Sequence, residues 1–213
     1  MKNILFFILL INYSFSSAQQ LAVLKYKGGG DWYANPTALP NLINFCNKNI
    51  HTAIDLKTQT TTLDDDTINN YPIVFITGHG NIFFSEEETI ILRNYLTSGG
   101  FLHISDNYGL DKYIRREMKK VFPTLNFQEI PNQHPIYHQT FSFDKGLPKI
   151  HEHDKKPAQG FGLFYKGRLV AFYDYQSDLS DGWEDYQIHN NPEKTRIKAL
   201  KMGANIIEYT FKH

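Results

Sequence analysis

A continuous apolar run at residues 73–77 (IVFIT) is the feature that most constrains the fold. A run of strand length without polar alternation is typical of a strand covered on both faces, as in a parallel sheet. Ser85 and Glu88 then form a capping box that starts a helix, and two glycines at residues 99–100 end it. Residues 101–105 (FLHIS) predict the next buried strand. This order of strand, helix and strand favours a parallel, doubly wound sheet.

The same alternation continues on both sides of this unit. It predicts further strands at residues 20–26, 52–56 and 125–130, a helix opened by Pro36, and a helix at residues 110–121. Apolar residues recur at helical spacing after Pro36, and Cys46 lies among them. Cys46 is therefore expected in the core. Because it is the single cysteine, we do not expect it to form a zinc site by itself.

The last third of the chain predicts a hairpin and a closing helix. Residues 161–165 and 168–173 should pair and extend the sheet at one edge. Asn191 is the expected cap of the last helix, with Pro192 at its first position. We therefore expect one α/β domain with a doubly wound, mainly parallel sheet and an edge hairpin.

The first 18 residues resemble a secretory signal peptide. Lys2 precedes an apolar run too short to span a bilayer, and the run ends in small residues up to Ala18 that a signal peptidase can recognise. We predict cleavage after Ala18, a mature domain at residues 19–213, and a periplasmic or secreted location. No cysteine directly follows the run, so we expect no lipid anchor. Because the run is removed with the signal peptide, we also expect no transmembrane span after cleavage.

The charges of the mature chain are balanced. Subtracting Lys2 from the 22 basic residues leaves 21 against 22 acidic residues. Such a balance provides no attractive field for a polyanion, so we expect no nucleic-acid partner.

Three polar loops, at residues 28–33, 78–81 and 105–109, follow predicted parallel strands. Ligands of open parallel sheets bind beyond the carboxyl ends of the strands, so these loops should form one cleft. The ligand-binding residues expected there are Gly28, Gly29, Gly30, Asp31, Trp32, Tyr33, Gly78, Gly80 and Asn107, with His134 and His138 as a roof. His79 and Asp106 are the candidate catalytic residues, because an imidazole or a carboxylate at a strand end can exchange protons with a substrate.

Each of these assignments has a structural alternative. The glycines at residues 28–30 either let backbone N–H groups approach a ligand or form a tight turn, and their spacing fits no dinucleotide or phosphate motif. His79 is alternatively a turn histidine, and Asp106 alternatively caps the helix that starts near Leu110. Ser105 does not fit a nucleophile elbow, because its neighbours are not the glycines that such a turn needs.

Two histidine pairs lie in the irregular segment after residue 131. His134 and His138 are four residues apart, and His151 and His153 form the second pair. Either pair, together with a candidate catalytic residue, has the ligand types of a metal site. An incidental cluster is the alternative, and we assign no metal and no cofactor.

Segments in order across nearly the whole mature chain resemble the domain-of-unknown-function 4159 family. They include LKYKGGGDWY, FITGHGNIFFSEEE, LRNYLTSGGFLHISDN, EIPNQHPIYHQTF, GLP, KGRLVAFY, SDLSDGWE and ALKMGANIIEY. The family looks like a member of the class I glutamine amidotransferase-like superfamily, which implies a flavodoxin-like sheet. Its members are often exported, and some occur beside MoxR-type ATPases and von Willebrand factor A proteins of the bacterial envelope. Amidotransferases use a Cys after a central strand, whereas this chain has Asp106 and Asn107 there, so glutamine hydrolysis is not expected.

The sequence thus predicts an exported envelope protein that binds a small molecule, a sugar or a peptide in the cleft. The alternative is a hydrolase, with or without a metal, that uses His79, Asp106, His134 and His138 with water as the nucleophile. A third possibility is an envelope scaffold in which an exposed Trp183 and the neighbouring acids in SDLSDGWEDY dock a partner protein. The alternative for Trp183 is a packed loop residue.

Overall fold

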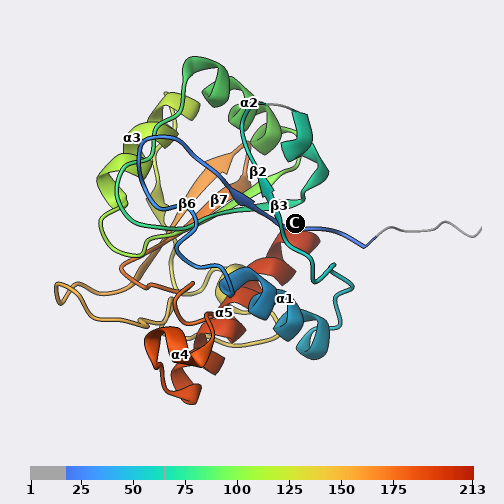
Figure 1. The fold of residues 1–213 in the computed structure, drawn as a ribbon, viewed down its shortest axis with the longest axis vertical. Coiled ribbons are helices and arrows are strands. Elements are labelled where there is room, and N and C mark those ends of the chain that lie inside the picture. Colours follow the sequence, from blue (N-terminus) through green and yellow to red (C-terminus); the bar gives the residue numbers. More distant parts are fainter. Residues whose placement is uncertain (1–17, 65) are drawn as a thin grey trace, which may run out of the picture.

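The computed structural model describes residues 18–64 and 66–213 (Figure 1). The strands are β1 (Ala22–Leu24), β2 (Gln59–Thr61), β3 (Ile73–Ile76), β4 (Phe101–Ser105), β5 (Gln128–Glu129), β6 (Gln159–Tyr165) and β7 (Arg168–Tyr175). The helices are α1 (Ala38–Asn49), α2 (Glu86–Thr97), α3 (Asp111–Val121), α4 (Tyr186–His189) and α5 (Glu193–Lys212), with short 3-10 helices η1 (Asp66–Asn70) and η2 (Pro135–Tyr137). Apart from Ala18, the predicted signal peptide lies outside the described residues. Within the described part, no helix combines the length and the apolar character needed to cross a membrane.

The strands form one sheet in the order β2-β1-β3-β4-β7-β6-β5. The first five strands of that order are parallel, while β6 runs antiparallel to β7, and β5 antiparallel to β6. The predicted α/β class, the mainly parallel sheet and the hairpin at one side are therefore confirmed. The parallel strands follow the 2-1-3-4-5 order of doubly wound sheets, whose switch point lies here between β1 and β3.

Helices cover both faces of the sheet (Figure 1). α1 and α5 contact each other on one face, and α2 and α3 contact each other on the other face. Cys46 is fully buried in α1, as predicted, and burial raises the pKa of its thiol to about 12. Trp183 is also fully buried, and its indole N–H donates to the Ala199 carbonyl (2.9 Å), so the prediction of an exposed docking tryptophan is wrong.

Two predicted strands differ from the structure. Within residues 52–56, Ile54 forms only an isolated bridge, because the Asn47 side chain accepts from its N–H (3.1 Å) and donates to its carbonyl (2.8 Å). The strand predicted at residues 125–130 is reduced to β5 at the far edge of the sheet. It cannot follow β4 in the parallel series, because β7 occupies the place beside β4.

The ends of the last helix also differ slightly from the prediction. Pro192, not Asn191, is the residue that precedes the first turn of α5. The sequence predicts an apolar stripe on this helix, made of Ile197, Leu200, Ala204, Ile207 and Phe211, that seals one face of the sheet. Its three middle residues are buried, whereas Ile197 and Phe211 at its two ends are exposed.

Candidate functional site

The loops that follow β1 and β3 pack directly against each other at the switch point. The backbone N–H of Gly30 donates to the Asn81 carbonyl (3.0 Å), and that of Asp31 donates to the His79 carbonyl (3.3 Å). A Cβ atom at Gly30 would lie 2.6 Å from the His79 carbonyl oxygen. Glycine at this position therefore permits the close approach of two loops, and both N–H groups already have acceptors.

His79 and Asp31 form an imidazole–carboxylate pair at this junction. Nδ1 of His79 lies 3.0 Å from Oδ2 of Asp31, and Oδ1 of Asp31 accepts from the backbone N–H of His79. Trp32 is half-buried, and the exposed ring of Tyr33 packs edge-on against it with centroids 5.5 Å apart. The first two predicted loops thus converge, and their histidine faces solvent. Gly80 of the second loop also lies with Asp106 and Tyr108 of the third around one hollow.

Asp106 is buried at the end of β4. Its Oδ1 accepts from the N–H of Leu110 (3.0 Å), and its Oδ2 accepts from the Tyr173 hydroxyl (2.9 Å). Burial raises the pKa of this carboxyl, although both hydrogen bonds act in the opposite direction. Oδ1 thus holds the turn before α3 and Oδ2 ties it to β7, but Asp106 does not cap the helix, because Leu110 is the N-cap residue and has no side-chain cap hydrogen bond.

His134 and His138 lie away from this edge of the sheet. The His134 ring packs against Phe164 (6.1 Å between centroids), which pairs with Leu169 near the start of β7. The carboxyl ends of the parallel strands are at the opposite end of β7. Nε2 of His138 lies 2.7 Å from the Asn132 carbonyl within its own segment. The predicted roof over the cleft is therefore wrong, because η2 packs on α5 instead.

A cluster of imidazoles and carboxylates occupies the carboxyl edge instead. We call it the histidine–aspartate cluster, and it consists of His151, His153, Asp178, Asp181 and His189. The first two histidines precede β6, and the other three residues follow β7. The N–H of Ile150 donates to the Ser177 carbonyl (2.9 Å), which joins these two segments.

Asp181 is the centre of the cluster. Its Oδ2 lies 3.1 Å from Nδ1 of His151, and its Oδ1 lies 3.6 Å from Nε2 of His189. Oδ1 also accepts from the side-chain amides of Asn35 (2.7 Å) and Asn107 (2.9 Å). Burial acts to raise the pKa of Asp181, but the hydrogen bond from His151 and the charge of His189 prevail and lower it. The predicted residue Asn107 thus does reach the site, through this carboxylate.

His151 lies between two carboxylates. Besides Asp181, its Nδ1 faces Oδ2 of Asp178 at 3.5 Å, and its Nε2 lies 2.9 Å from Oδ1 of Asn191. The interactions with Asp178 and then Asp181 raise the pKa of His151 to about 10. Asp178 is 1% exposed and its Oδ2 also contacts Nε2 of His153, whereas its Oδ1 has no hydrogen-bond partner among the described residues.

An open hollow of about 480 Å³ lies beside the cluster. The residues that line it include Asp106, Tyr108, Asp111, Lys112, Lys156 and Tyr175. The Tyr108 ring stacks on His153 with centroids 4.5 Å apart, which joins the hollow to the cluster. Aromatic faces beside charged groups suit a polar ligand such as a sugar or a peptide.

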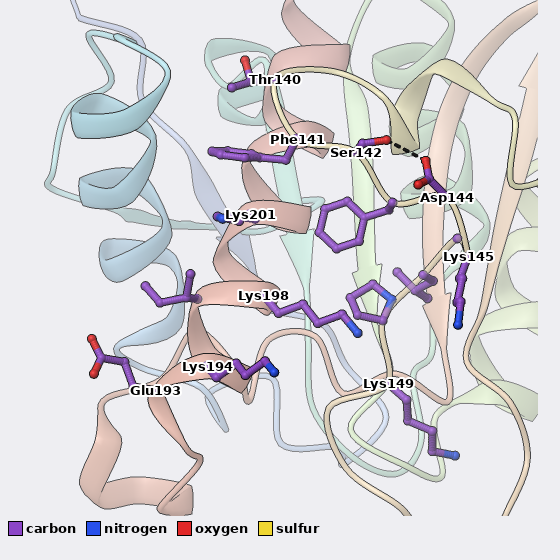
Figure 2. Close-up of a pocket in the computed structure, with 15 residues that line it drawn as sticks. Thr140, Phe141, Ser142, Asp144, Lys145, Lys149, Glu193, Lys194, Lys198 and Lys201 are labelled. Atoms are coloured by element: carbon purple, nitrogen blue, oxygen red, sulfur yellow. Dashed lines mark hydrogen bonds between the residues drawn. The ribbon is translucent and has the colours of Figure 1, made fainter.

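A larger hollow of about 930 Å³ lies between residues 140–149 and the first half of α5 (Figure 2). Figure 2 shows lysines on both of its sides, among them Lys149 and Lys198. None of the predicted site residues lines it. We assign the candidate site to the smaller hollow, because it lies at the strand ends and its Tyr108 stacks on His153 of the cluster, whereas volume alone indicates no chemistry.

The sequence singled out His151 and His153 but not Asp178, Asp181 or His189. The only local signal for the two aspartates was the run SDLSDGWEDY, which fits a solvated loop equally well, and His189 had no local signal. Their pairing with histidines some thirty residues earlier depends on the segment at 148–153 folding back onto the end of β7.

Comparison with known families gives one match. The model of a family described as "Domain of unknown function (DUF4159)" matches residues 20–211, which include the whole cluster and the smaller hollow. No protein of curated function matches the chain significantly.

Proposed function

Since the chain belongs to the family defined by the domain of unknown function DUF4159, we propose that it is an exported, ligand-binding domain of the bacterial cell envelope. Its ligand, a sugar, a peptide or another small polar molecule, occupies the hollow of about 480 Å³ at the carboxyl edge of the sheet. The strand order also supports membership of the class I glutamine amidotransferase-like superfamily.

The observation that carries this proposal is the position of the hollow. It lies beyond the ends of β4 and β7, where Asp106 and Tyr175 line it, and this is where open parallel sheets bind ligands. Tyr108 presents an exposed ring at φ +75°, a backbone conformation that is uncommon for tyrosine. An aromatic ring held there in spite of that strain supports a role in contacting a ligand.

The position of the single cysteine argues against a thiolate mechanism at this site. Cys46 is buried in the α1 layer and its pKa is raised, so it provides no nucleophile in the hollow. The hydrolase alternative in its predicted form needs His79, Asp106, His134 and His138 to converge. His134 and His138, which flank η2, lie toward the other end of the sheet, so this catalytic set is not supported.

The proposal is tested by thermal unfolding of the mature chain in the presence of sugars, short peptides and cell-wall fragments. A ligand at a hundred times its Kd stabilises the folded state by about 2.7 kcal/mol. For a chain of this size that corresponds to a rise in Tm of roughly 5–10 °C.

The variant Tyr108→Asn removes the ring, and asparagine tolerates the positive φ at this position. It should abolish the shift, whereas the control Tyr186→Asn, at a similarly exposed tyrosine outside the hollow, should keep it. The proposal fails if no compound shifts the wild-type Tm, or if Tyr108→Asn responds like the wild type.

A further inference from the structure

We propose that His151, Asp181 and His189 bind one divalent transition-metal ion, for which zinc is the best fit. The site is distinct from the hollow of the proposed ligand and does not depend on that ligand. It is the part of the histidine–aspartate cluster in which each of three side chains offers one metal-ligand atom.

The donor atoms already lie close together. Nδ1 or Nε2 of each histidine and a carboxylate oxygen of Asp181 all lie within 4.8 Å of one another. Zinc binds nitrogen and oxygen at roughly 2.0–2.2 Å in tetrahedral geometry, so two of its ligand atoms are about 3.4 Å apart. The closure required is at most about 1.5 Å. The side chains of His151 and His189 are 24% and 29% exposed, which leaves both rings room for that movement.

The neighbouring amides orient these side chains as metal ligands are usually oriented. Oδ1 of Asn191 lies 2.9 Å from Nε2 of His151 and accepts a hydrogen bond from it, so a metal ion would bind at Nδ1 in place of the proton that now lies between Nδ1 and Asp181. Asn35 and Asn107 donate to Oδ1 of Asp181, which leaves its Oδ2 toward His151. Ligating histidines typically donate their other N–H to such an acceptor, and ligating carboxylates are typically hydrogen-bonded in this way.

A separate observation, the charge balance, points to a cation. Asp178 and Asp181 are both buried. In the part of the chain that the structure describes, they form ion pairs with histidines and with no lysine or arginine. Oδ1 of Asp178 is buried without a hydrogen-bond partner in the same described part. Buried carboxylates are normally paired with a cation or coordinate a metal, and a divalent ion bound in place of the His151 proton would add positive charge between these two carboxylates.

The ligand types select the kind of metal. Two imidazoles and one carboxylate are typical of catalytic zinc and of non-haem iron, whereas calcium and magnesium prefer oxygen ligands only. Three protein ligands also leave a coordination position open to water or to a bound molecule.

The experiment is a calorimetric titration of the chelator-treated mature protein with Zn²⁺ alone. The wild type should bind one ion per chain. His189→Ala removes a ligand and should weaken zinc binding by roughly a hundredfold or more, because loss of a supporting partner alone typically costs about 10–100-fold. Asn191→Ala should fall within that smaller range. The control His138→Ala removes a histidine of similar exposure outside the cluster and should leave the affinity unchanged.

Several results would overturn the proposal. The first is a wild type that binds none of Zn²⁺, Fe²⁺, Co²⁺ and Mn²⁺ at one ion per chain. The second is a His189→Ala variant that binds zinc as tightly as the wild type. The third is a loss of zinc affinity in His138→Ala equal to that in His189→Ala, which would indicate scattered surface binding. Circular dichroism checks the fold of each variant, and His189→Gln replaces His189→Ala if the latter does not fold. In addition, Co²⁺ should produce visible absorption in the wild type that His189→Ala loses.

Discussion

His103, on the strand whose polar end first suggested chemistry, is a buried residue of the core. Its ring lies among Phe75, Phe172 and Trp183, and its Nε2 is 2.8 Å from Oδ2 of Asp174. Burial lowers the pKa of His103 to about 3 and raises that of Asp174 well above its usual range. Both directions follow from the same cause, because the interior penalises charge on either group.

This histidine should make the protein sensitive to mild acid. The folded-state pKa of His103 lies below that of the unfolded chain, so its contribution is complete above about pH 6.5. It is lost progressively as the pH falls toward 3, by up to about 1.4 kcal/mol per pH unit, because only the unfolded chain takes up the proton. The raised pKa of Asp174 acts in the opposite direction, so the test is the difference between two proteins. Urea unfolding at pH 7, 6 and 5 should show that acidification lowers the stability of the wild type relative to that of His103→Gln. Equal pH slopes in the two proteins would contradict this.

At the scale of elements, local signals in the sequence were sufficient for α2. Oγ of Ser85 accepts from the N–H of Glu88 (3.2 Å), and Oε2 of Glu88 accepts from the N–H of Ser85 (2.7 Å), as the predicted capping box requires. The convergence of the loops after β1 and β3 was likewise predictable, because parallel strands end at the same edge. Which histidines reach that edge was not predictable from spacing.

Removal of this cap should measurably destabilise the protein. Ser85→Ala leaves the N–H of Glu88 without its acceptor and should lower the free energy of unfolding by about 1 kcal/mol. The corresponding fall in Tm is roughly 2–4 °C, measured by calorimetry. Ser98→Ala, at the other end of α2, removes only bonds to carbonyls of the same helix and should cost less. The cap has no energetic role if the two variants unfold alike.

At the scale of the whole molecule, the segment after β7 holds distant parts together. The Thr37 side chain does not cap α1, and the first turn of that helix has no acidic residue. The buried carboxylate of Glu184 accepts instead from the N–H groups of Thr37 (3.0 Å) and Ala38 (2.9 Å) and from the Thr37 hydroxyl (2.7 Å). The same segment contributes Trp183 to the core and Asp181 to the histidine–aspartate cluster.

Glu184→Gln tests this long-range cap. It removes the charge at the N-terminus of α1 and should lower the free energy of unfolding by about 1–3 kcal/mol, because hydrogen bonds to a charged, buried acceptor are among the stronger ones. Denaturant unfolding measures the change. Glu129→Gln, on the exposed edge strand β5, should stay within about 0.5 kcal/mol of the wild type. A Glu184→Gln protein as stable as this control would show that α1 needs no cap from outside.

The sequence by itself determined the alternation of β1, β3 and β4 with α1, α2 and α3, the buried cysteine and the cap of α2. These features depend on periodicity and on side chains within one turn of each other, so the information is local. Only the tertiary structure decided that β7 lies beside β4, that β5 is at the edge, and that His151 meets Asp181 and His189. Such contacts join segments that no local pattern relates, and their geometry follows from how the strands and the irregular segments pack.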